Sequence, residues 1–375
     1  MGRLLSIMRK EFIHIRRDPR TLIIMFLIPV VQMILLGYAA TTNVEHLTTA
    51  VLDQDHTISS RALIDAYQAS NYFDIAYYVQ RQEDLFALLD SGKAKAGMVI
   101  PAGYGHDLAR GDQVQIAFFI DGSDPSIAST AFAAAQSVGQ AQSVKITMRA
   151  MESKGGDMKS LPGIDVRPRV LYNPEMKSAS FMIPALIGTI LQYLTTLFTA
   201  LAIVREREQG TIEQLIVTPI KPWELVVGKV LPYVVIAFWD LGEVLLVGML
   251  WFGVPIRGSI LLLLGLATLF LLTSLGIGLL ISAVAHTQQE AMFMTFLILL
   301  PSIFLSGFFF PLEAMPILLQ GVSYAIPLRY FLIIVRSIVL KGVGVTSLTS
   351  EVIALSIFGL VIMALATRSF HKRLE

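Results

Sequence analysis

The chain has 375 residues, of which 54% are hydrophobic and only 15% charged. Soluble proteins usually carry about 25% charged residues, so the composition argues against an ordinary soluble protein. The net charge of +1 argues against a nucleic-acid-binding protein, which would concentrate basic residues on one domain. Since the chain has no cysteine, it has neither disulfides nor thiolate metal sites.

Six stretches are apolar and long enough to be read as membrane-spanning helices, which need roughly 20 residues. Helix is the expected conformation because an open sheet would leave backbone groups unsatisfied in lipid. The six stretches are residues 21–40, 181–204, 225–250, 259–285, 291–310 and 352–367. The sequence therefore predicts a multi-pass membrane protein.

Lys and Arg residues beside these stretches predict their direction. Basic residues precede the first span, follow the second and follow the last, and six spans place all three segments on one side. The positive-inside rule makes that side the cytoplasm. Arg329, Arg336 and Lys341 disagree, because they fall on the outer side. A seventh span at residues 328–340 is the alternative, but about a dozen residues are too few to cross, so we expect a re-entrant or interfacial helix there.

The first span could also be a signal peptide, since Gly37-Tyr38-Ala39 resembles a cleavage site. The long basic region before it and the length of the apolar run favour a retained span.

Residues 42–177 read like an ordinary soluble domain and are too long for a simple loop. Short apolar runs alternate with helical patterns, which predicts a small α/β domain. The expected strands are residues 50–52, 73–79, 97–100, 114–120 and 166–172, and the expected helices are residues 59–70, 82–89 and 127–151. The main interpretation is a structural or gating cap, and a site for a substrate or partner is the alternative.

A P-loop, which a chain that hydrolyses ATP would need, is absent from the sequence. Gly92-Lys93 is followed by Ala94 and lacks the upstream glycine, and Lys159-Ser160 is preceded by Met158. We therefore expect no catalytic residues, no resident cofactor and no metal on this chain, with any ATP hydrolysis on another chain.

The loop after the second span carries the most informative motif. Thr211 is a suitable helix N-cap with Gln214 three positions later, as in a capping box, and Pro219 would end this short helix. Glu206-Arg207-Glu208-Gln209-Gly210-Thr211-Ile212-Glu213-Gln214-Leu215 resembles the E-R-E-x-G-T-x-E-x-L motif of type-2 ABC exporter permeases. The likeness covers nearly the whole chain and is strongest for bacterial multidrug-type permeases with an extended outer domain.

The resemblance implies that this loop is a coupling helix, at about residues 205–223, that docks on a separate ATPase subunit holding ATP and Mg. The residues implied in this contact are Arg205, Glu206, Arg207, Glu208, Gly210, Thr211, Glu213 and Gln214. Further implied partners are a second copy or a related permease, the lipid bilayer and an adaptor in the periplasm, with no nucleic acid.

The expected architecture is an all-α membrane bundle of six transmembrane helices with an inserted extracytoplasmic α/β domain between helices 1 and 2. Residues 1–20 would be a cytoplasmic interfacial helix, 21–41 the first transmembrane helix and 42–177 the outer domain. Residues 178–375 would hold helices 2–6, with an outer re-entrant segment at about 308–345. The expected location is the bacterial cytoplasmic (inner) membrane, with both termini in the cytoplasm.

Asp240 and Glu243 lie inside the third span, three residues apart and hence on one helical face. A carboxylate near the bilayer centre costs roughly 2.5–3.5 kcal/mol, so it should face protein or water. These residues either line a translocation path, for a cationic substrate or for protons, or bond to Trp239, Gln192 or a neighbouring helix.

The expected function is a permease for a hydrophobic or amphipathic substrate, either drug-like or lipid-like. The alternative is a non-transporting scaffold or sensor whose outer domain binds a partner. An intramembrane enzyme is poorly supported, because Asp240 and Glu243 have no matched nucleophile and His286 stands alone.

Overall fold

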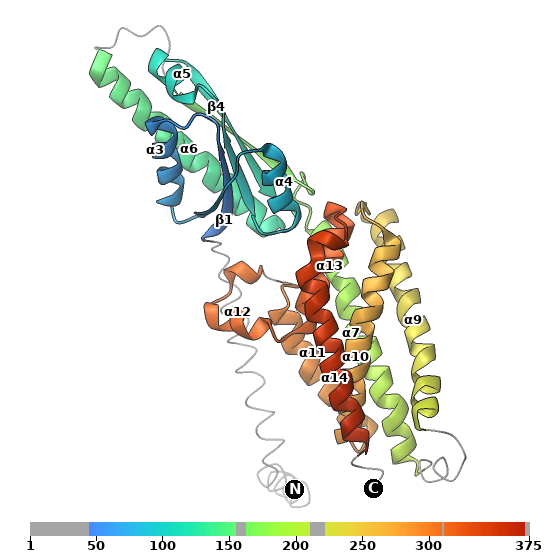
Figure 1. The fold of residues 1–375 in the computed structure, drawn as a ribbon. Helices are drawn as coiled ribbons and strands as arrows, with labels where there is room; N and C mark the ends of the chain where they lie inside the picture. Colours follow the sequence, from blue (N-terminus) through green and yellow to red (C-terminus); the bar gives the residue numbers. More distant parts are fainter. Residues whose placement is uncertain (1–44, 155–162, 211–221, 310, 372–375) are drawn as a thin grey trace, which may run out of the picture.

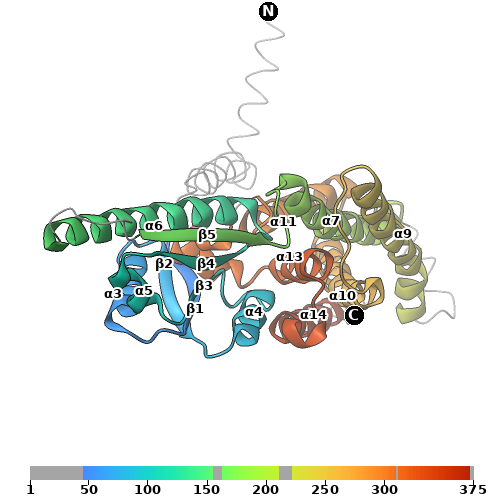
Figure 2. The same cartoon turned by 90° about the horizontal axis from the view of Figure 1, so that it is seen from above.

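The computed structural model describes residues 45–154, 163–210, 222–309 and 311–371. We call residues 45–177 the sheet domain and residues 178–371 the helical domain (Figure 1). Seen from above, the sheet domain projects to one side of the helices (Figure 2). The expected N-terminal interfacial helix and the first expected span lie outside the described residues.

Five strands form one sheet in the order β2-β1-β3-β4-β5. The strands β3 and β4 are antiparallel, and every other neighbouring pair is parallel. Their bounds are Leu47–Asp53 for β1, Phe73–Tyr78 for β2, Ala96–Ile100 for β3, Gln113–Asp121 for β4 and Gly163–Leu171 for β5.

Helices cover both faces of this sheet because side chains alternate between the faces along each strand. On β1, Leu47 and Val51 pack toward α3 (Ile58–Gln68) and α6 (Pro125–Lys154), whereas Ala50 and Leu52 pack toward α4 (Gln82–Asp90). The short helix α5 (Tyr104–Arg110), which the sequence did not predict, joins β3 to β4.

A cluster of rings fills the core on the α3 side. The ring of Tyr67 lies 5.5 Å from those of Phe73 and Phe118, and its hydroxyl donates to the Ala135 carbonyl at 2.9 Å. Gly97 allows α4 to approach the other face, since a Cβ there would lie 2.6 Å from Leu85 Cδ2. The sheet domain therefore has a core of its own.

The described residues of the helical domain form five long helices and a set of short ones. The long helices are α7 (Ser178–Glu208), α9 (Pro222–Leu250), α10 (Ile260–Val284), α11 (Gln288–Leu305) and α14 (Thr349–His371). The short elements are η1 (Leu312–Ala314), α12 (Ile317–Ser323), α13 (Pro327–Arg336), η2 (Ser337–Lys341) and η3 (Val345–Leu348).

Helix α7 packs against α9, α10, α11 and α13. Gly278 permits the close approach of α10, because a Cβ at this position would lie 2.7 Å from the Thr196 carbonyl oxygen. Small residues at such crossings are how helices pack closely within membranes. Helix α7 is therefore in contact with four other helices of the helical domain.

Among the described residues, four helical stretches are long and apolar enough to cross a membrane. They are Ser178–Glu208, Ile260–Val284, Gln288–Leu305 and Val345–Ser369. A fifth arises only if α12 and the continuous stretch Pro327–Lys341 count together, although they are bent by 88°. We call these two segments the bent pair. The bend lies in the region expected to hold a re-entrant or interfacial helix.

Candidate functional site

The candidate site is the last turn of α7, where the expected ATPase-coupling residues begin. The helix ends at Glu208 with Gln209 as its C-cap, and Gly210 follows with a φ of +71°, in the left-handed region that glycine adopts without strain. Arg205 and Arg207 occupy the last turn, where positive charge offsets the partial negative charge of a helix C-terminus.

Arg207 binds the end of α10. Its Nη1 donates to the carbonyl oxygens of Ser282 at 2.7 Å and Ala285 at 2.9 Å. Carbonyls in the last turn of a helix have no hydrogen-bond donor within that helix, so the guanidinium of Arg207 supplies the missing donor at the end of α10. Ser282 and Ala285 are both fully buried.

Glu208 binds the start of α11. Its Oε2 accepts hydrogen bonds from Gln288 Nε2 at 2.9 Å and from the Gln288 backbone N–H at 3.2 Å. A negative charge is favourable at a helix N-terminus, so the Glu208 carboxylate suits the start of α11. Two successive residues of α7 therefore hold both sides of the turn between α10 and α11. We call Arg207, Glu208, Ser282, Ala285 and Gln288 the α7 junction.

The turn itself is fixed by capping bonds. Thr287 Oγ1 accepts from the Glu290 N–H at 3.1 Å, and Glu290 Oε2 accepts from the His286 N–H at 2.8 Å. The sequence reasoning missed this half of the junction. A signal was present, since Thr287-Gln288-Gln289-Glu290 is a Ser/Thr-x-x-Glu capping pattern.

Of the other residues predicted to contact the ATPase, the structure describes those up to Gly210. Arg205 is exposed and Glu206 is half-buried at the end of α7. Thr211, Glu213 and Gln214, and with them the expected coupling helix, lie outside the described residues. The described part of the site is thus the root of the loop between α7 and α9.

Asp240 and Glu243 lie far along the chain from this junction, on α9. Asp240 is half-buried and Glu243 is exposed, whereas their neighbour Leu241 is fully buried in the helical core. Within the described residues, Asp240 Oδ2 has no hydrogen-bond partner, and neither has Gln192 Oε1. The expected bond from Asp240 to Gln192 is therefore not seen at these atoms.

A group of buried polar side chains lies where α7 meets α10 and α11, and the sequence reasoning did not single it out. Thr196 Oγ1 donates to the Ser274 carbonyl at 3.2 Å. Several other buried polar atoms have no partner in the described part of the chain: Gln192 Oε1, Thr195 Oγ1, Thr199 Oγ1 and Ser274 Oγ. Such groups are rare in proteins and call for a reason.

In the described ranges, no three His, Asp or Glu side chains are grouped so that they could hold a metal ion. The residues of the α7 junction form hydrogen bonds between helices and supply no nucleophile aligned with a base. What this site provides is attachment of the last turn of α7 to α10 and α11.

Comparison with known proteins gives consistent matches along the chain. A family profile described as "ABC-2 family transporter protein" matches residues 19–368. The probable multidrug ABC transporter permease YbhS of Escherichia coli is 32% identical over 98% of this chain and 96% of its own length. The probable multidrug ABC transporter permease YbhR of the same organism is 30% identical over 90% of each chain. The linearmycin resistance permease protein LnrN of Bacillus subtilis is 24% identical over 93% of this chain and 94% of its own.

Proposed function

Because the chain belongs to the ABC-2 family of transporter permeases, we propose that it forms the export path for a hydrophobic or amphipathic substrate, driven by ATP hydrolysis on separate subunits. Permeases of this family are membrane subunits and not ATPases, so this chain is a multi-pass membrane protein that partners with ABC ATPase subunits.

The α7 junction is the observation that carries the proposed coupling. Residues 211–221 join α7 to α9, so a partner that pulls on this loop pulls on the last turn of α7. Arg207 passes that displacement to α10 and Glu208 passes it to α11. Coupling between distant sites travels through packed elements of this kind. We therefore assign the ATPase contact to residues 205–214.

The substrate path is proposed along the buried polar groups of α7, α10 and α11. Polar atoms without a protein partner can bind water or the polar part of a substrate, while the surrounding apolar residues accept its hydrophobic part. The names of YbhS and YbhR support a drug-like molecule. Asp240 and Glu243, on α9, are the proposed contact for a cationic group and would need a second permease copy to cover them.

The proposed assembly has two permease chains, identical or related, and two ATPase subunits that hold ATP and Mg. We place six transmembrane helices in each permease, with the sheet domain outside the cytoplasmic membrane as an inserted α/β domain and both termini in the cytoplasm. An adaptor in the periplasm is a further candidate partner of the sheet domain.

Co-purification of an ABC ATPase with this chain tests the proposed contact. We expect the ATPase co-expressed from the same gene cluster to co-purify with the wild type, and most of it to be lost when Glu206, Glu208 and Glu213 are changed to glutamine.

The matched control is a triple glutamine variant at Glu83, Glu152 and Glu175, which removes the same charge from exposed positions of the sheet domain. It should retain the ATPase. Equal retention by both variants would show that the assigned residues are not the contact. Failure of any ATPase to bind the inserted wild type would favour the scaffold alternative.

A further inference from the structure

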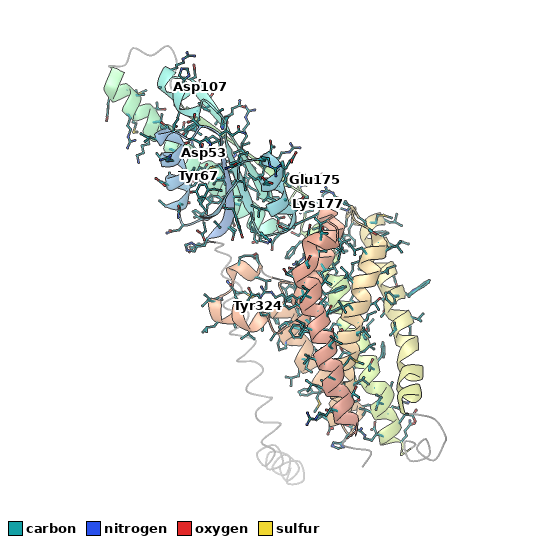
Figure 3. The ribbon with its side chains drawn as sticks, in the orientation of Figure 1. Asp53, Tyr67, Asp107, Glu175, Lys177 and Tyr324 are labelled. Atoms are coloured by element: carbon teal, nitrogen blue, oxygen red, sulfur yellow. The ribbon has the colours of Figure 1, made fainter. Side chains whose placement is uncertain are left out.

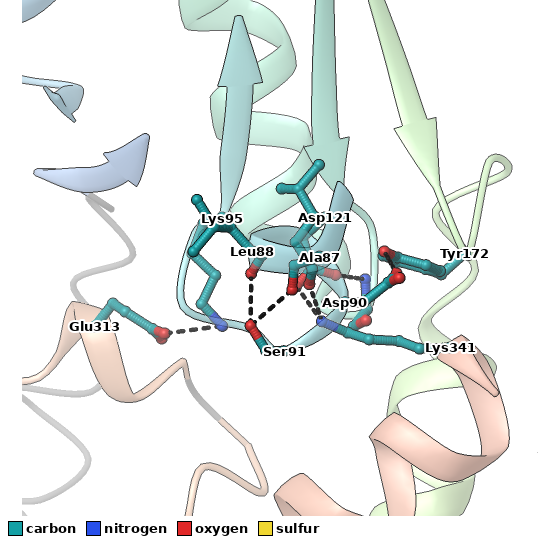
Figure 4. A network of polar contacts seen from close by, with 11 residues as sticks. Ala87, Leu88, Asp90, Ser91, Lys95, Asp121, Tyr172, Glu313 and Lys341 are labelled. Carbon is teal, nitrogen blue, oxygen red and sulfur yellow. Dashed lines mark hydrogen bonds and ion pairs between the residues drawn. The ribbon is translucent and has the colours of Figure 1, made fainter. Parts of the chain in front are cut away.

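Two ion pairs join the sheet domain to the helical domain (Figure 4). Lys341 Nζ lies 2.7 Å from Asp121 Oδ2, and the two side chains are only 5% and 3% exposed. Lys341 Nζ also donates to the Leu89 carbonyl at 2.9 Å and lies 5.1 Å from the centre of the Tyr172 ring. This pair is closed off from water.

The second ion pair is more open. Lys95 Nζ lies 3.2 Å from Glu313 Oε1, with 26% of the lysine and 36% of the glutamate side chain exposed. The Glu313 carboxylate raises the pKa of Lys95 above its usual range. Burial alone raises the pKa of Glu313, but Lys95 more than offsets this and lowers it. Both groups are therefore charged near neutral pH.

The two residues that the sheet domain contributes to these ion pairs, Lys95 and Asp121, are hydrogen-bonded to each other. The Asp121 N–H donates to the Lys95 carbonyl at 2.9 Å, beside the antiparallel pairing of β3 with β4. Because the backbones of Lys95 and Asp121 are joined in this way, the two charged side chains move together with the sheet domain.

One partner lies just before the bent pair, and the other is its last residue. Glu313 is in η1, just before α12, and Lys341 ends the stretch that continues α13. The sheet domain thus holds the beginning and the end of the bent pair at one position. A movement that separates Glu313 from Lys341 has to break one of the two ion pairs, because Lys95 and Asp121 are joined in the sheet domain.

Packing indicates which of them separates. Six residues of α13 are buried against the helical core, whereas Ser323 is the one buried residue of α12. Ile317 and Leu318 of α12 are 84% and 81% exposed, and the same helix leads to Tyr324 (Figure 3). The end held by Lys341 is therefore the more deeply packed of the two. Helix α12 has fewer buried side chains, and its other attachments include the packing of Met315 with Leu305 and the hydrogen bond from Arg329 to the Gln320 carbonyl.

We propose that Lys95 and Glu313 are positioning residues that hold α12 in the position seen in this structure, and that their ion pair separates during the export cycle while the more deeply buried pair of Asp121 and Lys341 stays joined. The inference rests on the proposed export function. It gives the sheet domain a task beyond binding a partner, because separation at Glu313 frees the less packed half of the bent pair.

Reversible cross-linking tests this, and because this chain has no cysteine, the introduced pair is its only thiol target. The permease carrying Lys95→Cys and Glu313→Cys is assembled with its ATPase and joined with a bifunctional methanethiosulfonate that spans the two side chains. We expect ATP-dependent export of a fluorescent amphipathic dye to be lost on linking and restored by a reducing agent. The linking rate should also fall when the ATPase is trapped with ATP.

Full export by the linked complex, or a linking rate that does not respond to ATP, would overturn the inference while leaving the proposed function intact. No export by the wild-type complex would overturn the proposed function, and the inference with it.

A second variant tests the inference in case the permease with both cysteines does not fold. Glu313→Gln keeps the side-chain shape and removes the charge, so it should raise leakage of the dye without ATP. Glu175→Gln, at an exposed pair with Lys177, should not raise it. Equal leakage from both variants would overturn the inference.

Discussion

Replacing Lys341 with methionine should lower the free energy of unfolding by about 3–5 kcal/mol, the usual cost of leaving a buried charge without its partner. The partner left behind is Asp121, whose carboxylate is almost fully buried. Burial alone raises the pKa of Asp121, but Lys341 and Lys95 more than offset this and lower it below its usual range. The stabilisation is therefore present at neutral pH and lost as the pH falls through the lowered pKa.

Thermal unfolding in detergent micelles measures the loss. The control is Lys177→Met, which breaks an exposed pair with Glu175 worth about 0–1 kcal/mol (Figure 3). The double change Lys341→Met with Asp121→Asn should recover much of the stability, since no charge stays buried alone. Similar unfolding midpoints for Lys341→Met and Lys177→Met would contradict the account.

Replacing Arg207 with alanine should uncouple ATP hydrolysis from export. The change removes two hydrogen bonds from a charged donor to buried carbonyls, each worth about 1.5–3 kcal/mol. Because α10 then loses these two hydrogen bonds to the last turn of α7, we expect a pull on the loop to be passed to α10 less effectively. We expect the ATPase to remain bound and to hydrolyse ATP, while export per ATP falls about tenfold or more.

The matched control is Arg205→Ala, which removes the same charge from an exposed position in the same turn of α7. It should reduce export per ATP far less. If Arg205→Ala and Arg207→Ala reduce it equally, the effect is one of charge near the ATPase and not of attachment to α10.

Local signals located most strands of the sheet domain but could not arrange them. The pattern around residues 97–100 and 114–120 matched β3 and β4, because Pro101 and Asp121-Gly122 end the apolar runs. The strand order depends on contacts between distant segments, so no local pattern contains it. Helix α5 was missed because it is short and has glycine on both sides.

Arg329, Arg336 and Lys341 disagree with the orientation expected from the positive-inside rule, and the structure shows what each of them contacts. Lys341 pairs with Asp121, 220 residues away, a contact that sequence periodicity cannot show. Arg336 donates to the Gly307 carbonyl at 2.9 Å, and its guanidinium lies 3.6 Å from the Phe181 ring. Arg329 lies 3.8 Å over the Tyr324 ring. All three side chains therefore have contacts within the protein.

The sequence pointed to the α7 side of the candidate site but not to its partners on α10 and α11. The motif at the end of α7 pointed to Arg207 and Glu208, but nothing in it identified Ser282, Ala285 or Gln288 as their partners. Those contacts depend on how α10 and α11 pack against α7. Buried polar groups such as Thr199 and Ser274 were likewise hidden, since one hydroxyl in an apolar run has no distinctive pattern.

ATP-dependent export by the purified complex tests directly whether this chain forms an export path that is driven by its ATPase. The permease and its ATPase are reconstituted in liposomes, with the ATPase facing outward, and uptake of a fluorescent amphipathic dye into the lumen is followed. We expect the dye to accumulate only when both the chain and hydrolysable ATP are present. Accumulation that is equal with a non-hydrolysable analogue, or absent although the bound ATPase is active, would contradict this expectation.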